Sequence, residues 1–132
     1  EGPYGAFTRF SKAGNHVLLV GAGVGVTPLR ALLEDLPHTT DVVCVLRAST
    51  EADIPHLDEI RKLLDRRDGR LHVLVGSRDA VPMDEALPAV VPDLAGRDIY
   101  VCGPGGFTTA VEETARRWGA DAEQIHSEAF AF

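Results

Sequence analysis

The chain has 132 residues, of which 45% are hydrophobic and 25% charged, which suits one globular domain with a single core. Its formal net charge of -7 argues against nucleic-acid binding, because basic residues make most phosphate contacts. No apolar run approaches the roughly 20 residues of a membrane-spanning helix, and no signal-peptide pattern opens the sequence. We therefore expect a cytoplasmic location, with no membrane contact by this chain itself.

The predicted strands are short runs rich in Val, Leu and Ile that end in small or polar residues, at 16–23, 41–49, 71–78 and 98–105. The predicted helices lie between and after them, at 28–36, 54–67, 83–91 and 107–119, and an extended stretch at 124–132 closes the chain. The strands are almost continuously apolar, which is typical of strands covered on both faces. This alternation predicts an α/β fold, with a parallel sheet and helices on both of its faces.

Helix ends and cysteines give further expectations. We expect Thr27 to cap the first helix, with Pro28 at its first position, and Gly119 to end the last helix. Because Cys44 lies in an apolar predicted strand, we expect it to be a reduced thiol in the core. The sequence has no C-x-x-C pair and its five histidines lack metal-ligand spacing, so we predict no metal site.

Two glycine-rich turns follow predicted strands. "GAGVG" contains Gly21, Gly23 and Gly25, and "CGPGG" begins at Cys102. Ligands bind beyond the carboxyl ends of parallel strands, and helix N-termini hold anions. If the first and fourth strands are neighbours, the two turns form the lips of one cleft for a dinucleotide. The alternative for "GAGVG" is a tight turn that binds nothing.

Residues at the ends of the second and third strands bear on the choice of nucleotide. An NAD site often has an acid after the second strand, to hold the ribose 2′-hydroxyl. Here Arg47 occupies that region, and no acid follows before Glu51. Arg47, Ser77 and Arg78 would suit a 2′-phosphate, so we expect NADP(H) to be preferred over NAD(H). The alternative is that these arginines are ordinary solvated charges.

Five segments in this order, "GPYGAF", "GAGVGVTPL", "VLVGSR", "YVCGPGG" and "SEAF", resemble the pyridine-nucleotide domain of the ferredoxin–NADP reductase superfamily. The likeness is greatest to the branch of flavin-linked ferric reductases and NADPH oxidases. It implies a doubly wound, Rossmann-like sheet of five parallel strands in the order 3-2-1-4-5. It also implies that residues 1–14 are the tail of an upstream flavin domain with its linker, and that 15–132 form the nucleotide domain.

The resemblance assigns roles by position. Pyrophosphate binding falls to Gly21, Gly23, Gly25, Thr27 and Pro28, and 2′-phosphate binding to Ser77 and Arg78. The loop facing the nicotinamide is Cys102, Gly103 and Pro104, while Glu128 lies near the reacting rings and Phe130 or Phe132 covers the flavin. The catalytic candidates are Cys102, Glu128 and Thr27; their alternative roles are a core thiol, a solvated acid and a helix cap.

The function implied is hydride transfer from NADPH to FAD on the upstream domain, and then electron transfer to haem, iron or an iron–sulfur partner. The isolated chain is expected to be inactive without that flavin domain. A parent of the ferric-reductase type would lie in the cell membrane, with this domain on the cytoplasmic side. The alternatives are the nucleotide half of an NADH-dependent oxygenase-type reductase and a non-catalytic nucleotide-sensing module.

Overall fold

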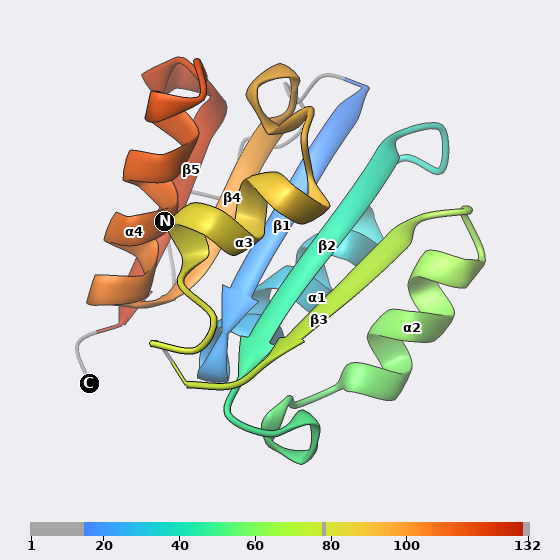
Figure 1. The fold of residues 1–132 in the computed structure, drawn as a ribbon. Coiled ribbons are helices and arrows are strands. Elements are labelled where there is room, and N and C mark those ends of the chain that lie inside the picture. The colour runs from blue at the N-terminus through green and yellow to red at the C-terminus, as the bar shows by residue number, and fades with distance from the viewer. Residues whose placement is uncertain (1–14, 78, 131–132) are drawn as a thin grey trace.

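The computed structural model describes residues 15–77 and 79–130, with the side chain of Phe130 excepted. One parallel sheet organises the chain, in the order β3-β2-β1-β4-β5 (Figure 1). Its strands are β1 (His16–Ala22), β2 (Asp41–Ala48), β3 (Arg70–Val75), β4 (Asp98–Pro104) and β5 (Ile125–Phe130). The predicted strand order 3-2-1-4-5 is confirmed.

Helices cover both faces of this sheet. They are α1 (Val26–Asp35), α2 (Leu57–Asp65), α3 (Met83–Val90) and α4 (Gly105–Arg117). The apolar side chains of α1 and α2 join one core cluster, and those of α3 and α4 join another on the opposite face (Figure 1). The predicted doubly wound architecture is therefore confirmed.

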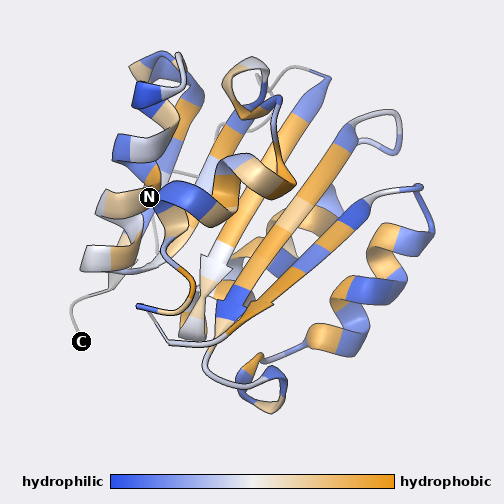
Figure 2. Ribbon diagram, viewed as in Figure 1, coloured by the Kyte–Doolittle hydropathy of each residue, from blue (hydrophilic) through white to orange (hydrophobic). Residues whose placement is uncertain are grey.

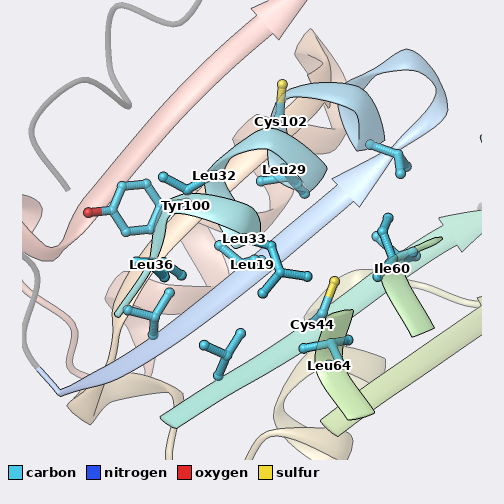
Figure 3. Packing of buried hydrophobic residues seen from close by; sticks show 14 of the residues in the cluster. Leu19, Leu29, Leu32, Leu33, Leu36, Cys44, Ile60, Leu64, Tyr100 and Cys102 are labelled. Carbon is cyan, nitrogen blue, oxygen red and sulfur yellow. The ribbon is translucent and has the colours of Figure 1, made fainter. Parts of the chain in front are cut away.

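Successive residues of each central strand serve opposite cores. Val17 and Leu19 of β1 belong to the cluster under α1, whereas Leu18 and Val20 belong to the cluster under α3 and α4. The middle strands are accordingly apolar along almost their whole length (Figure 2). Figure 3 shows the first cluster, in which leucines of α1 and α2 pack on the strands around Cys44.

The expected start of the first helix is wrong by about half a turn. A 3₁₀ turn, η3 (Gly23–Gly25), leads directly into α1, so Thr27 is the second helical residue and Pro28 the third. In this described segment no side chain caps α1. Such 3₁₀ turns are common at helix ends, and a proline in the first helical turn lacks only an N–H that has no partner within the helix.

The other helices differ less from expectation. The second helix begins at Leu57 rather than at 54, because His56 adopts a left-handed conformation with φ 60°. Pro88 lies inside α3, within the range predicted for the third helix. The last helix ends as predicted, where Gly119 takes a φ of 106°.

A buried arginine ties the amino ends of three strands together. Arg97 is 1% exposed and donates hydrogen bonds to the carbonyls of Val17 (3.1 Å) and Asp41 (3.2 Å). It also pairs with the carboxylates of Asp41 (2.8 Å) and Asp93 (3.1 Å), and it lowers the pKa of Asp93. This network holds β1, β2 and β4 in register at the end opposite the glycine turns.

Candidate nucleotide-binding cleft

A cavity of about 370 Å³ opens at the carboxyl ends of four strands. Its wall includes the residues that follow β1, β2, β3 and β4, among them Ala22, Gly23, Arg47, Gly76, Ser77 and Pro104. Ligand pockets for small molecules span about 300–1,000 Å³. The position of this one, where the strand order reverses between β1 and β4, is where doubly wound sheets bind ligands.

The two glycine-rich turns contact each other. β1 pairs with β4 so that Gly21 lies beside Cys102. A methyl group on Gly25 would overlap the carbonyl of Cys102 and lie 2.8 Å from the amide nitrogen of Gly103. One on Gly103 would lie 3.3 Å from the carbonyl oxygen of Ala22. The expectation that the turns lie side by side is confirmed, and the close approach explains why Gly25 is a glycine.

Gly21 and Gly23 occupy different environments. Gly21 is buried, and a methyl group on it would lie 2.5 Å from Cδ1 of Leu29 in α1. Gly23 is exposed, lines the cavity and has a φ of 58°, and among the described residues no atom lies within 4 Å of where its Cβ would be. A left-handed residue with open space before it, at the first N–H groups of a helical segment, suits an anion.

Thr27 and Pro28 lie beyond the cavity wall. Thr27 is exposed on the first turn of α1, whereas Pro28 is buried. Neither is among the residues that line the cavity. Their contact with a nucleotide therefore stays a prediction.

Cys102 and Glu128 lie next to each other on neighbouring strands, paired in register between β4 and β5. The Cys102 side chain is fully buried, at the end of the first core cluster nearest the beginning of α1 (Figure 3). Burial, assisted by the negative charge of Glu128, raises the pKa of the Cys102 thiol to about 12. Cys102 is therefore a neutral thiol near pH 7 and not a nucleophilic thiolate.

The same face of β4 and β5 carries a stacked ring pair. Tyr100 and His126 stack with ring centroids 4.6 Å apart and planes inclined by 18°. Burial raises the pKa of Tyr100 to about 12 and lowers the pKa of His126. Near neutral pH the stacked rings are thus uncharged. Tyr100 lies two residues before Cys102, and His126 lies two residues before Glu128.

At the other end of the cleft, Arg47 and Ser77 line the cavity as the sequence suggests. The third strand is fixed there by a hydrogen bond from the Gly76 amide to the carbonyl of Ala48 (3.0 Å). The Ser77 hydroxyl accepts a hydrogen bond from the amide of Ala80 (3.2 Å). The cavity thus brings Arg47 and Ser77 together with Gly23 and Pro104.

The predictions for Arg78, Phe132 and the segment 1–14 fall outside the described residues, as does the side chain of Phe130. The structure adds one acid that sequence reasoning missed. Asp53 lines the cavity, although Glu51 is the first acid after the second strand. No local pattern signalled this, because the orientation of the turn depends on the burial of Ile54 and on the pairing of Glu51 with Arg61.

Among residues 15–77 and 79–130, no group of three or more His, Cys, Asp or Glu side chains is placed to hold a metal ion. In the same described ranges, no helix is both long enough and apolar enough to span a membrane.

The family model for the oxidoreductase NAD-binding domain matches residues 19–113, which include α1 to α3 and β2 to β4, together with parts of β1 and α4. The chain belongs to this family. One similar relative is the ferredoxin reductase component of 3-ketosteroid-9-alpha-monooxygenase from Mycolicibacterium smegmatis, which is 32% identical over 86% of this chain. Another is the glycine betaine monooxygenase reductase subunit from Chromohalobacter salexigens, which is 31% identical over 98% of this chain. The chain spans only 33% and 39% of the lengths of these relatives.

Solved structures agree with this assignment. The FAD/NAD-binding domain of nitric oxide dioxygenase from Vibrio cholerae is similar with a TM-score of 0.76 and 25% identity, over 88% of this chain and 51% of that one. A cytochrome P450 reductase from Amycolatopsis shares the fold with a TM-score of 0.72 at 20% identity, over 94% of this chain and 40% of that one.

Proposed function

We propose that this chain is the nucleotide-binding half of a flavin-dependent oxidoreductase, in which hydride passes from NADPH to an FAD on an upstream domain. Electrons then pass to a haem, iron or iron–sulfur acceptor. The observation that carries the proposal is Gly23, which is left-handed, exposed and open to the cavity at the start of the helical segment that leads into α1. That geometry suits a pyrophosphate.

The residues around the cavity have distinct tasks in this proposal. The amides of the η3 turn hold the pyrophosphate, and the loop from Gly103 to Pro104 directs the nicotinamide toward Cys102 and Glu128. When bound, the nicotinamide supplies the hydride that the flavin accepts. Because the Cys102 thiol is neutral and fully covered in this structure, the atoms above it must move aside before it contacts a ring.

The proposed preference for NADP(H) rests on charge at the other end of the cavity. Arg47 and Ser77 lie on its wall, and Arg78 follows Ser77 in the sequence. Guanidinium groups bind phosphate in bidentate fashion. A 2′-phosphate placed over the ends of β2 and β3 would therefore find cationic and hydroxyl partners.

The names of the relatives support an oxygenase-type reductase as the full-length protein to which this chain belongs. Two are reductase parts of monooxygenases and a third, from Chromobacterium violaceum, is a flavohemoprotein. An oxygenase-type reductase is therefore a second candidate for the parent, besides the ferric-reductase type. Both candidates use this chain for the same step, from reduced nicotinamide to flavin.

A reconstitution experiment tests the proposal. The chain is mixed with the separately expressed flavin domain of its parent, and bleaching of the flavin absorbance is followed after NADPH is added. We expect bleaching only when both are present. The variant Gly23→Asp should slow it far more than Gly23→Asn, because both residues tolerate a left-handed φ and only Asp adds a charge that repels pyrophosphate.

Two outcomes oppose the proposal. Bleaching of equal rate without this chain would remove its role in hydride transfer. Binding of NADPH by the chain without any bleaching would instead favour the nucleotide-sensing module.

A further inference from the structure

The strand β3 forms one edge of the sheet (Figure 1). Within the described residues it pairs only with β2, in a register that has no break. The amide of Gly76 donates a hydrogen bond to the carbonyl of Ala48 (3.0 Å), so this amide points toward β2. Because backbone groups of successive residues in a strand point to opposite sides, those of Leu71, Val73 and Val75 point outward. These three residues present a row of donors and acceptors along the edge.

The sequence of β3 does not protect this edge. Natural sheets protect their edge strands with prolines, lysines, bulges or inward-pointing charges. The strand RLHVLV has no proline or lysine, and its one arginine is the first residue. Its four central residues are half-buried, and Val75 at its end is 46% exposed. An apolar edge of this kind is a template for pairing with another strand.

A hollow of about 400 Å³ lies between this edge and α2. Leu64 of α2 and Leu71 and Val73 of β3 supply its apolar wall, while Arg61 and Asp65 of α2 supply one charge of each sign. The chain as a whole has a net charge of -7, which opposes the association of two copies. At this hollow the two charges cancel, so a second copy can approach β3 without that repulsion.

The opposite edge of the sheet is less suited to pairing. The middle of β5 is polar and consists of His126, Ser127 and Glu128. The Ser127 hydroxyl is already engaged, since it donates a hydrogen bond to the carboxylate of Glu112 in α4 (2.6 Å). A strand added at β5 would therefore bury less apolar surface than one added at β3.

We propose that two copies of this chain associate through β3, with their strands antiparallel and related by a two-fold axis at Val73. In this register each outward residue of β3 meets an outward residue of the second copy: Val73 faces Val73, and Leu71 faces Val75. These side chains lie on the α2 face of the sheet, where Leu71 and Val73 already pack, and pairing covers the exposed Val75. On the other face His72 lies opposite Leu74. The two five-stranded sheets thereby become one continuous sheet.

Sedimentation equilibrium of the chain without nucleotide, over a range of concentrations, tests the association. The unaltered chain should approach twice the mass of one copy as its concentration rises. Val75→Lys should raise the dissociation constant of the dimer by about tenfold or more, because each copy then places a charge opposite Leu71 of the other. Val24→Lys is the matched control, because Val24 is similarly exposed, at 50%, but lies in the turn η3, and it should leave the constant unchanged.

Hydrogen exchange of the unaltered chain identifies the edge that pairs. The amides of Leu71, Val73 and Val75 should exchange more slowly as the dimer forms, because they gain hydrogen bonds to the second copy. The amides of His72 and Leu74 point toward β2 and should be protected at every concentration.

Three outcomes would overturn the proposal. One is the mass of a single copy up to millimolar concentration, and another is a dimer whose outward β3 amides exchange as fast as in the monomer. The third is equal weakening by Val24→Lys and Val75→Lys, because the effect would then follow net charge alone. Since Val75 is exposed at the end of an edge strand, lysine there keeps the fold, and a urea unfolding curve of the variant verifies this.

Discussion

The contact between the two glycine turns predicts a large effect for Gly25→Ala. The added methyl group would overlap the carbonyl of Cys102 and lie 2.8 Å from the amide nitrogen of Gly103. These are backbone atoms of β4, which is paired on both sides within the sheet. Neither turn can yield as a flexible side chain would, so the clash must separate β4 from the beginning of α1.

The expected magnitude follows from this geometry. Overpacking against rigid neighbours costs about 1–3 kcal/mol, and a clash with central backbone lies at or above the upper end of that range. Gly23→Ala meets only the cost of a left-handed φ, about 1–2 kcal/mol, because the space before Gly23 is open. Gly96→Ala is the control, since in the described structure no atom lies within 4 Å of its Cβ position and its φ is not left-handed, so the change should be within about 0.5 kcal/mol.

Urea unfolding of the three variants beside the unaltered chain measures these differences in the free energy of unfolding. We expect Gly25→Ala to lose most of this free energy, Gly23→Ala less and Gly96→Ala almost none. A Gly25→Ala variant as stable as Gly96→Ala would refute the reasoning, because the two turns would then not be in contact.

Two further predictions concern buried groups. Arg97→Met should lower the free energy of unfolding by about 1–3 kcal/mol in urea, because it leaves the buried carbonyl of Val17 without this hydrogen-bond donor, while the carboxylates of Asp41 and Asp93 stay solvated. Arg70→Gln, which loses only an exposed 3.7 Å pair with Asp41, should cost less than about 1 kcal/mol, and equal losses would contradict the network. Stability should also fall from about pH 8 to pH 11, because burial raises the pKa of Cys44 to about 12 while an unfolded thiol ionises near pH 8.5, so that only the unfolded state loses this proton. Cys44→Ala should flatten that part of the pH profile, and an unchanged slope would speak against the buried thiol.

The sheet could be predicted because the sequence of each central strand is recognisable by itself. The run from Val17 to Val20 has apolar residues at every position, which only a strand covered on both faces requires. The beginning of α1 was misplaced because Thr27 and Pro28 match the chemistry of a helix cap. The helical segment in fact begins with the 3₁₀ turn Gly23–Gly25, before Thr27. That turn packs closely against β4 through Gly25, a tertiary contact that the local sequence does not show.

The sequence pointed to Gly23 and Arg47, which line the cavity, but not to Asp53, which also lines it. The sequence analysis noted only that no acid precedes Glu51 after the second strand, and it did not consider Asp53. Which of the two reaches the cavity depends on Ile54, whose burial under α1 and α2 orients the turn, and on Arg61, which holds Glu51 toward α2. Contacts between distant segments decide that orientation, and local patterns do not contain them.

The central claim is that a dinucleotide binds in the cavity over the ends of the two glycine turns, and NMR spectra of the chain titrated with NADPH test it most directly. We expect the largest shifts at the backbone amides of Gly23, Gly103 and Gly76, at the ends of β1, β4 and β3. Shifts confined to the acidic hollow around His56 and Glu59, or no shifts at all, would contradict it.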